Sequence, residues 1–220
     1  MSYQDILRHI TGEGVEEYDQ YQDAIHEHLD IGNGICRALV INWLIAKREN
    51  WNFWTDNRGT IAQSLLADAN RIQSAIHLQQ EYANAFGGRY VPDTATSNTL
   101  SQLSITYQQS DITASAQEGF AQTQLSNEPQ KIANQVLSAK SRFFILSLEG
   151  GAGGHSIGIH RPYALIGKSS EAYLFEPNFG EFKVSGVNNL ANLLIAINQY
   201  GYPGLDLNQK YILWSHYFLI

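Results

Sequence analysis

The sequence predicts an α+β protein, because segments with helical periodicity fill the first half of the chain and strand-like segments fill the second half. This order argues against an alternating βαβ protein, in which the two patterns would take turns along the chain. The 220 residues are 44% hydrophobic, which is enough for one packed core, and no linker-like stretch divides them. We therefore expect a single domain covering residues 1–220.

The helical elements come first. Residues 1–30 hold eight acidic side chains against a lone Arg8, so we expect an acidic N-terminal arm that forms a solvated helix or a partly mobile segment. Two glycines then precede Cys36, and apolar residues follow it at three- and four-residue spacing, which predicts a buried helix beginning near Cys36. The same spacing predicts helices over 59–86 and 129–139.

Strand patterns dominate from residue 141 onward. Apolar and β-branched runs bounded by turn residues are typical of strands, and two such runs joined by a short polar stretch are typical of a hairpin. We expect strands at 142–148, 155–160 and 181–184, hairpin arms at 163–167 and 172–176, an amphipathic helix over 187–199, and a closing strand at 211–220.

Composition excludes several classes of protein. The net charge of −7 and the absence of Lys/Arg clusters argue against nucleic-acid binding, which needs a basic surface. A single cysteine excludes an intrachain disulfide and a Cys-based zinc site, and the pair His26 and His28 is only a weak metal signal. We expect no cofactor and no metal. No run of about 18 apolar residues predicts a transmembrane helix, and the first residues lack the pattern of a cleavable signal peptide.

Cys36 is a candidate nucleophile. A cysteine at a helix N-terminus has its thiolate stabilised by unpaired N–H groups and by the helix dipole. The preceding glycines would let a substrate carbonyl approach the backbone, where the Cys36 N–H and the Asn33 side chain could bind an oxyanion. The alternative is that Cys36 is a small buried side chain that begins a helix.

A base and an orienting group come from the second half of the chain. His155 follows a glycine-rich loop and begins a strand, whereas His160, five residues later, points to the opposite face. Only one of them can face Cys36, and we prefer His155 for its position between loop and strand. Glu176 ends a strand before a Pro-Asn turn, where its carboxylate could accept the Nδ1–H of the imidazole, a task that Asn178 could also perform.

Three motifs together resemble one family. The ordered set GNGIC with Trp43, GGHSIGIH, and LFEPNFGEF resembles the YopT/AvrPphB cysteine protease family. The resemblance implies a papain-like fold, in which an N-terminal helical half carrying the cysteine helix packs on a C-terminal antiparallel sheet. It also implies a triad of Cys36, His155 and Glu176, with Glu where the family has Asp. Members are bacterial virulence effectors, secreted without a cleavable signal into host cells, where they cleave host proteins.

The same residues allow two other functions. A glutamine deamidase or transglutaminase would use the same first acyl-transfer step on a Gln side chain. A non-catalytic binding module with a decayed site is the third possibility, which the replacement of Asp by Glu176 favours. His160 stays open as the alternative base, because it lies sixteen residues before Glu176, the spacing that such Cys–His enzymes show.

Overall fold

The computed structural model describes residues 2–22, 35–50, 52–54, 107–110, 128–150, 153–202 and 210–216. Its centre is a seven-stranded antiparallel sheet with the order β1-β6-β5-β4-β3-β7-β2. The strands are β1 (Gly12–Glu17), β2 (Tyr107–Ser110), β3 (Phe143–Gly150), β4 (Gly153–His160), β5 (Glu171–Glu176), β6 (Gly180–Ser185) and β7 (Lys210–His216). The helices are α1 (Tyr3–Leu7), α3 (Cys36–Glu49), α8 (Glu128–Ser138) and α9 (Val187–Ala196), which continues into the π-helix η2 (Ile197–Gly201).

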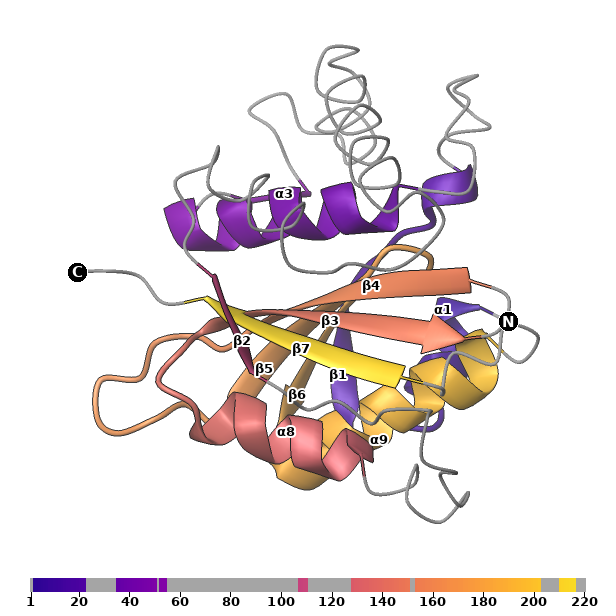
Figure 1. Cartoon of the computed structure of the whole chain (residues 1–220). Helices are drawn as coiled ribbons and strands as arrows, with labels where there is room; N and C mark the ends of the chain where they lie inside the picture. Colours follow the sequence, from indigo (N-terminus) through magenta and orange to yellow (C-terminus); the bar gives the residue numbers. More distant parts are fainter. Residues whose placement is uncertain are drawn as a thin grey trace.

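Helices cover both faces of the sheet. Helix α3 lies on one face, against β4 and β5, while α8 and α9 pack together on the other face (Figure 1). The α+β prediction, with the cysteine helix packed on an antiparallel sheet, is therefore confirmed. The helices predicted near Cys36, at 129–139 and at 187–199 are present, whereas the one predicted over 59–86 lies outside the described residues.

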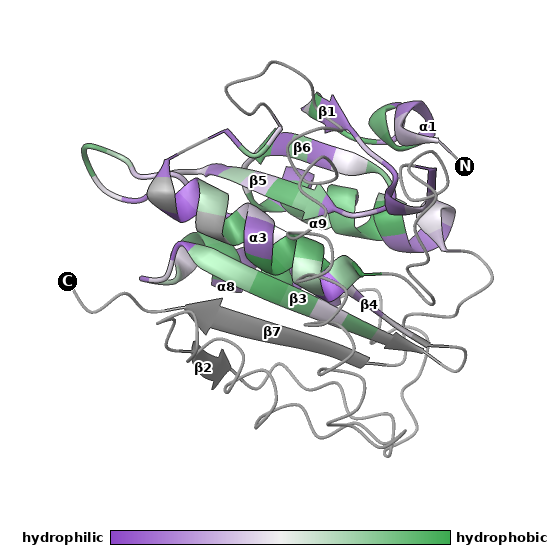
Figure 2. Ribbon diagram, turned by 90° about the horizontal axis from the view of Figure 1, so that it is seen from above, coloured by the Kyte–Doolittle hydropathy of each residue, from purple (hydrophilic) through white to green (hydrophobic). Residues whose placement is uncertain are grey.

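Each face of the sheet builds its own hydrophobic core. Neighbouring residues of β3 point to opposite faces, so Phe144 and Leu146 join the core under α8 and α9, while Phe143 and Ile145 join the core under α3. This explains why the strand is a continuous apolar run rather than an alternating one. Figure 2 shows the hydrophobic colouring along β3 and β5 beside α3.

Helix α3 is fixed to the sheet at both ends. Near its start, Arg37 Nη1 donates a hydrogen bond to Ser147 Oγ in β3 at 3.0 Å. Further along, the buried Glu181 carboxylate in β6 accepts hydrogen bonds from Trp43 Nε1 at 2.8 Å and Lys47 Nζ at 2.6 Å. The two contacts together set the position of the residue that begins the helix, Cys36.

A glycine lets the helix approach the sheet. A Cβ at Gly158 in β4 would stand 2.9 Å from Trp43 Cε3 and 3.2 Å from Val40 Cγ1, both in α3. The 2.9 Å distance is too short for carbon atoms that are not bonded, and the 3.2 Å distance is tight, so a side chain here would push α3 away from the strand. Glycine at this position therefore determines how close the helix carrying Cys36 lies to β4.

Two sequence predictions are wrong. Residues 12–17 were expected in a solvated helical or mobile arm, but they form the edge strand β1, which pairs with the edge of β6 that would otherwise be unpaired. Their side chains are nonetheless mostly exposed. Residues 163–167, expected as a hairpin arm, form a loop in which Leu165 and Ile166 are 94% and 93% exposed. Strand β5 already pairs with β4 and β6, so no edge is left for that segment.

Candidate active site

Three predicted site residues meet at one end of the sheet. Cys36 is the first residue of α3, His155 lies near the start of β4, and Glu176 is the last residue of β5. The Cys36 thiol is within hydrogen-bonding reach of the His155 ring, and the ring's Nε2 contacts Glu176 Oε1. The imidazole therefore lies between the thiol and the carboxylate.

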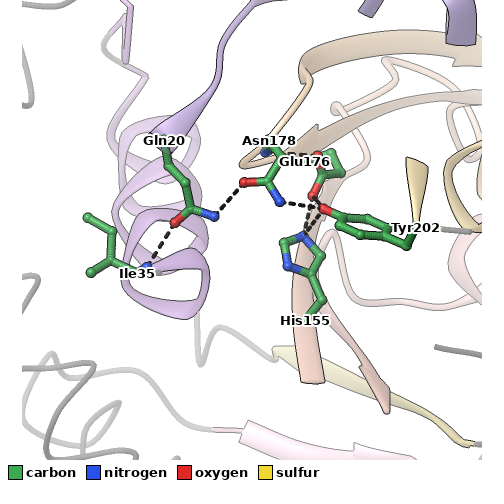
Figure 3. Close-up of polar contacts among 6 residues, drawn as sticks. All are labelled: Gln20, Ile35, His155, Glu176, Asn178 and Tyr202. Atoms are coloured by element: carbon green, nitrogen blue, oxygen red, sulfur yellow. Dashed lines mark hydrogen bonds and ion pairs between the residues drawn. The ribbon is translucent and has the colours of Figure 1, made fainter. Parts of the chain in front are cut away.

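The ring nitrogens are used in the opposite way from the one expected. Nε2 of His155 faces Glu176 and lies 2.9 Å from the Tyr202 hydroxyl (Figure 3). Nδ1 is therefore the nitrogen that remains available to the Cys36 thiol. The prediction that the carboxylate accepts the Nδ1–H is therefore wrong. The roles follow from where β4 and β5 hold the backbone of the two residues relative to α3, which the sequence does not encode locally.

The two groups stabilise each other as an ion pair. Burial raises the pKa of Cys36, but the positive charge of His155 and hydrogen bonds from its ring and from the Ser156 N–H outweigh burial, so the pKa falls below that of an ordinary thiol. Burial lowers the pKa of His155, but the negative charges of Glu176 and Cys36 raise it to about 10. The lowered pKa of the thiol and the raised pKa of the imidazole both favour a thiolate facing an imidazolium.

Tyr21 lies within electrostatic range of the candidate nucleophile. Its side chain is 40% exposed, and it lies close enough to Cys36 for the sulfur's negative charge, after burial, to contribute to a raised pKa of the phenol. Cys36 itself is half-buried.

Glu176 is completely buried and held by several donors. The Asn178 backbone N–H donates to Oε2 at 2.8 Å, and the Tyr202 hydroxyl donates to Oε1. A buried carboxylate is stable only when such donors replace water. Sequence reasoning considered Asn178 but missed Tyr202, because nothing in the local pattern around residue 202 indicates a contact with residue 176.

A chain of hydrogen bonds joins this carboxylate to the start of α3. Asn178 Nδ2 donates to the Tyr202 hydroxyl at 2.8 Å, and Asn178 Oδ1 accepts from Gln20 Nε2 at 2.6 Å. Gln20 Oε1 in turn accepts from the backbone N–H of Ile35, the N-cap of α3, at 2.8 Å (Figure 3). Sequence reasoning also missed Gln20, which sits in the acidic arm and carries no charge.

The remaining candidates lie elsewhere or outside the described residues. His160 points to the opposite side of β4, stacks on Phe143 with ring centroids 4.8 Å apart, and lies near Arg142 rather than near Cys36. Burial and the charges of Arg142 and Lys47 lower its pKa to about 3, so it is neutral at physiological pH. Asn33 lies outside the described residues. Within the described ranges, no group of three His, Cys, Asp or Glu side chains could hold a metal ion.

The comparison with known families gives this arrangement its context. The model of the Peptidase_C58 family, described as Yersinia/Haemophilus virulence surface antigen, matches residues 8–202. The chain belongs to this family. As a C58 peptidase it is a cysteine protease that hydrolyses peptide bonds, and the resemblance to the YopT/AvrPphB family seen in the sequence is confirmed. No curated protein sequence matches this C58 chain.

A solved structure shares the fold. The crystal structure of the Pseudomonas avirulence protein AvrPphB superimposes with a TM-score of 0.62 at 19% sequence identity, covering 99% of this C58 chain and 100% of the other. The papain-like fold is thereby confirmed. None of the helices that the structure describes is long and apolar enough to cross a membrane.

Proposed function

We propose that this C58 peptidase cleaves a protein of a host cell, with Cys36 as nucleophile, His155 as proton carrier and Glu176 as the group that orients His155. The observation that carries the proposal is the position of the His155 ring between the Cys36 thiol and the buried Glu176 carboxylate. Geometry of this kind is what nucleophilic catalysis by a thiol requires, because the base must reach the thiol while a third group fixes the ring.

In the first half-reaction the Cys36 thiolate attacks the carbonyl carbon of the scissile amide and forms a tetrahedral intermediate. His155 donates its Nδ1 proton to the amide nitrogen as the C–N bond breaks, so the amine product leaves neutral and an acyl thioester remains. In the second half-reaction His155 takes a proton from water, the hydroxide attacks the thioester, and the sulfur leaves as thiolate. Glu176 keeps the Nε2–H of the ring in place throughout.

The oxyanion of both intermediates needs hydrogen-bond donors. Cys36 is the first residue of α3, and the first backbone N–H that closes within the helix is that of Leu39, which donates to the Ile35 carbonyl at 3.0 Å. The N–H groups at a helix start have no intrahelical acceptor, and the helix dipole adds partial positive charge. The Cys36 N–H is accordingly the backbone donor proposed for the oxyanion, together with the Asn33 side chain.

The proposed setting is a host cell that receives the protein from a bacterium. Support comes from the family's description as a virulence surface antigen and from the naming of AvrPphB as an avirulence protein. Such proteins act on targets outside the cell that makes them, and a thiol peptidase without a disulfide suits the reducing interior of a host cell.

A peptide library derived from host proteins tests the reaction. The wild-type chain should produce new N-termini that mass spectrometry detects, and Cys36→Ala should reduce cleavage to background while its thermal unfolding stays close to wild type. Cleavage by Cys36→Ala at the wild-type rate would exclude the proposed nucleophile.

The same library separates the two alternative functions. Ammonia release without new N-termini would indicate deamidation or transglutamination of Gln side chains instead of proteolysis. Alkylation of wild-type Cys36 by iodoacetamide no faster than alkylation of free cysteine would indicate a non-catalytic binding module. The contact between Glu176 and His155 argues against a decayed site, because the longer side chain still meets the ring.

A further inference from the structure

We infer that Tyr202 is a positioning residue of this peptidase: its hydroxyl fixes the rotation of the Glu176 carboxylate and thereby holds the His155 ring toward Cys36. The inference rests on the function proposed above and adds a fourth side chain to it. Glu has one more rotatable bond than Asp, so its carboxylate can swing further unless both oxygens are held. A group that must keep an imidazole in place tolerates little such movement.

The Tyr202 hydroxyl touches three groups of the site. Asn178 Nδ2 donates to it at 2.8 Å, it donates to Glu176 Oε1, and its oxygen lies 2.9 Å from His155 Nε2 (Figure 3). An amide nitrogen has no acceptor capacity, so the phenol oxygen accepts from Asn178 and its single proton is free to go to Glu176. The Nε2–H of His155 then points toward two oxygens, Oε1 of Glu176 and the hydroxyl oxygen of Tyr202.

Both carboxylate oxygens are therefore fixed, by different donors. Oε2 of Glu176 accepts the Asn178 backbone N–H at 2.8 Å, and Oε1 accepts the Tyr202 hydroxyl. Without the Tyr202 hydroxyl, rotation of the carboxylate about its last bond would be opposed only by the Asn178 N–H on Oε2 and by His155 itself on Oε1. The oxygen that faces His155 is thus the one that Tyr202 controls.

The backbone of η2 places Tyr202 beside Glu176. Helix α9 ends in the π-helix η2, and wide turns of this kind often occur at functional sites. Gly201, the last residue of η2, packs directly on the Phe179 ring of the turn after β5, and a Cβ there would stand 2.6 Å from Phe179 Cε2. The close approach of this backbone to the Glu176–Gly180 turn is what lets the next side chain, Tyr202, reach Glu176.

The ring and the hydroxyl of Tyr202 have separable tasks. The residue is only 8% exposed, and its ring packs edge-on to Phe179 with centroids 5.8 Å apart. Tyr202→Phe keeps this packing and removes only the hydroxyl. Tyr200→Phe is the matched control, because Tyr200 lies in η2 as well and stacks on His9 at 4.1 Å, away from the triad.

Two measurements separate positioning from a structural role. The first is the rate of Cys36 alkylation by iodoacetamide as a function of pH, which follows the thiolate without needing a substrate. The second is the kcat and KM of hydrolysis of a peptide selected from the library. For Tyr202→Phe we expect rapid alkylation of Cys36 over a narrower pH range than in the wild-type chain. We also expect kcat to fall about tenfold or more with KM unchanged, because one hydrogen bond to a charged group is lost. Tyr200→Phe should match wild type in both.

A double variant tests whether Tyr202 acts through Glu176. In the Glu176→Gln background, Tyr202→Phe should add little further loss of kcat, whereas a residue that acts independently would multiply the two losses. Should Tyr202→Phe fail to fold, Gly201→Ala replaces it, since the added Cβ pushes η2 and the hydroxyl away from Glu176, and the same narrowing of the alkylation profile is expected.

The outcomes distinguish the two proposals. A wild-type alkylation profile and wild-type kcat for Tyr202→Phe, or independent losses in the double variant, would overturn the role of Tyr202 while leaving the triad intact. Slow alkylation of Cys36 in the wild-type chain itself would instead overturn the proposed triad, and with it any positioning role.

Discussion

Replacing Glu181 by Gln should weaken the attachment of helix α3 to the sheet and destabilise the fold. The buried carboxylate of Glu181 accepts Lys47 Nζ on Oε1 at 2.6 Å, and on Oε2 it accepts the indole Nε1 atoms of Trp43 at 2.8 Å and Trp54 at 2.6 Å. In a Gln side chain one of these oxygens becomes an NH2 group. Whichever way the amide turns, a donor then faces a donor.

The magnitude follows from those contacts. A hydrogen bond to a charged group contributes about 1.5–3 kcal/mol, and leaving a buried donor without an acceptor costs about 1–3 kcal/mol more. Removing one partner of a buried ion pair costs about 3–5 kcal/mol in total. We therefore expect Glu181→Gln to lower the free energy of unfolding by about 3–5 kcal/mol.

Urea unfolding followed by tryptophan fluorescence measures this loss directly, because Trp43 and Trp54 are the donors involved. With a slope of about 2 kcal/mol per molar urea, the midpoint should fall by roughly 2 M. Glu171→Gln is the matched control: its carboxylate pairs with Lys183 at 3.1 Å but is 44% exposed, so its replacement should change the midpoint little. A loss below about 1 kcal/mol, or one equal to that of the control, would refute the view that Glu181 anchors α3.

Three further predictions test the site and its support. The pKa of Cys36 is lowered, so iodoacetamide alkylation of Cys36 should reach its plateau at a lower pH than alkylation of free cysteine. The pKa of His155 is raised to about 10, so hydrolysis should fall as pH rises through about 10 and His155 loses the proton for the leaving amine. An alkylation profile that coincides with that of free cysteine would contradict the lowered pKa of Cys36. His160→Leu should leave kcat/KM at the wild-type value, because His160 is neutral and stacks on Phe143 at the far end of β4 from His155. Loss of activity in a folded variant would restore His160 as the candidate base. Gly158→Ala should destabilise the fold by about 1–3 kcal/mol through the clash with Trp43. Gly154→Ala in the same strand is the control and should be tolerated, because its Cβ would stand 3.5 Å from the Leu148 carbonyl oxygen. Equal urea midpoints for the two variants would count against the close packing of α3 on β4.

Local patterns were sufficient for much of the fold. The strand containing Phe143 and Ile145, the helix starting at Cys36 and the helix after Gly186 each carry their own periodicity, because burial on one face or on two faces leaves a repeat in neighbouring residues. The turn after Glu176 was likewise predicted from its Pro, Asn and Gly residues. There Gly180 has a φ of +122°, and a Cβ would stand 2.0 Å from the Glu16 carbonyl oxygen, so glycine is required.

Pairing between distant segments was beyond such patterns. The exposed loop with Leu165 and Ile166 has the composition of a strand, but both edges of β5 were already taken by β4 and β6. Conversely, the acidic residues 12–17 look solvated and are mostly so, yet their backbone completes the sheet beside β6. Strand identity depends on which edge is available, and that is a property of the whole sheet.

By itself the sequence determined the chemical groups of the site: one thiol at a helix start, an imidazole at the start of a strand, and a carboxylate before a tight turn. Only the tertiary structure decided which ring nitrogen of His155 faces which partner, and that Tyr202 and Gln20 join the network. The Gln20–Asn178 hydrogen bond spans 158 positions of the chain. Contacts over such distances leave no local period, because they are fixed by how the sheet, α3 and η2 pack rather than by neighbouring residues.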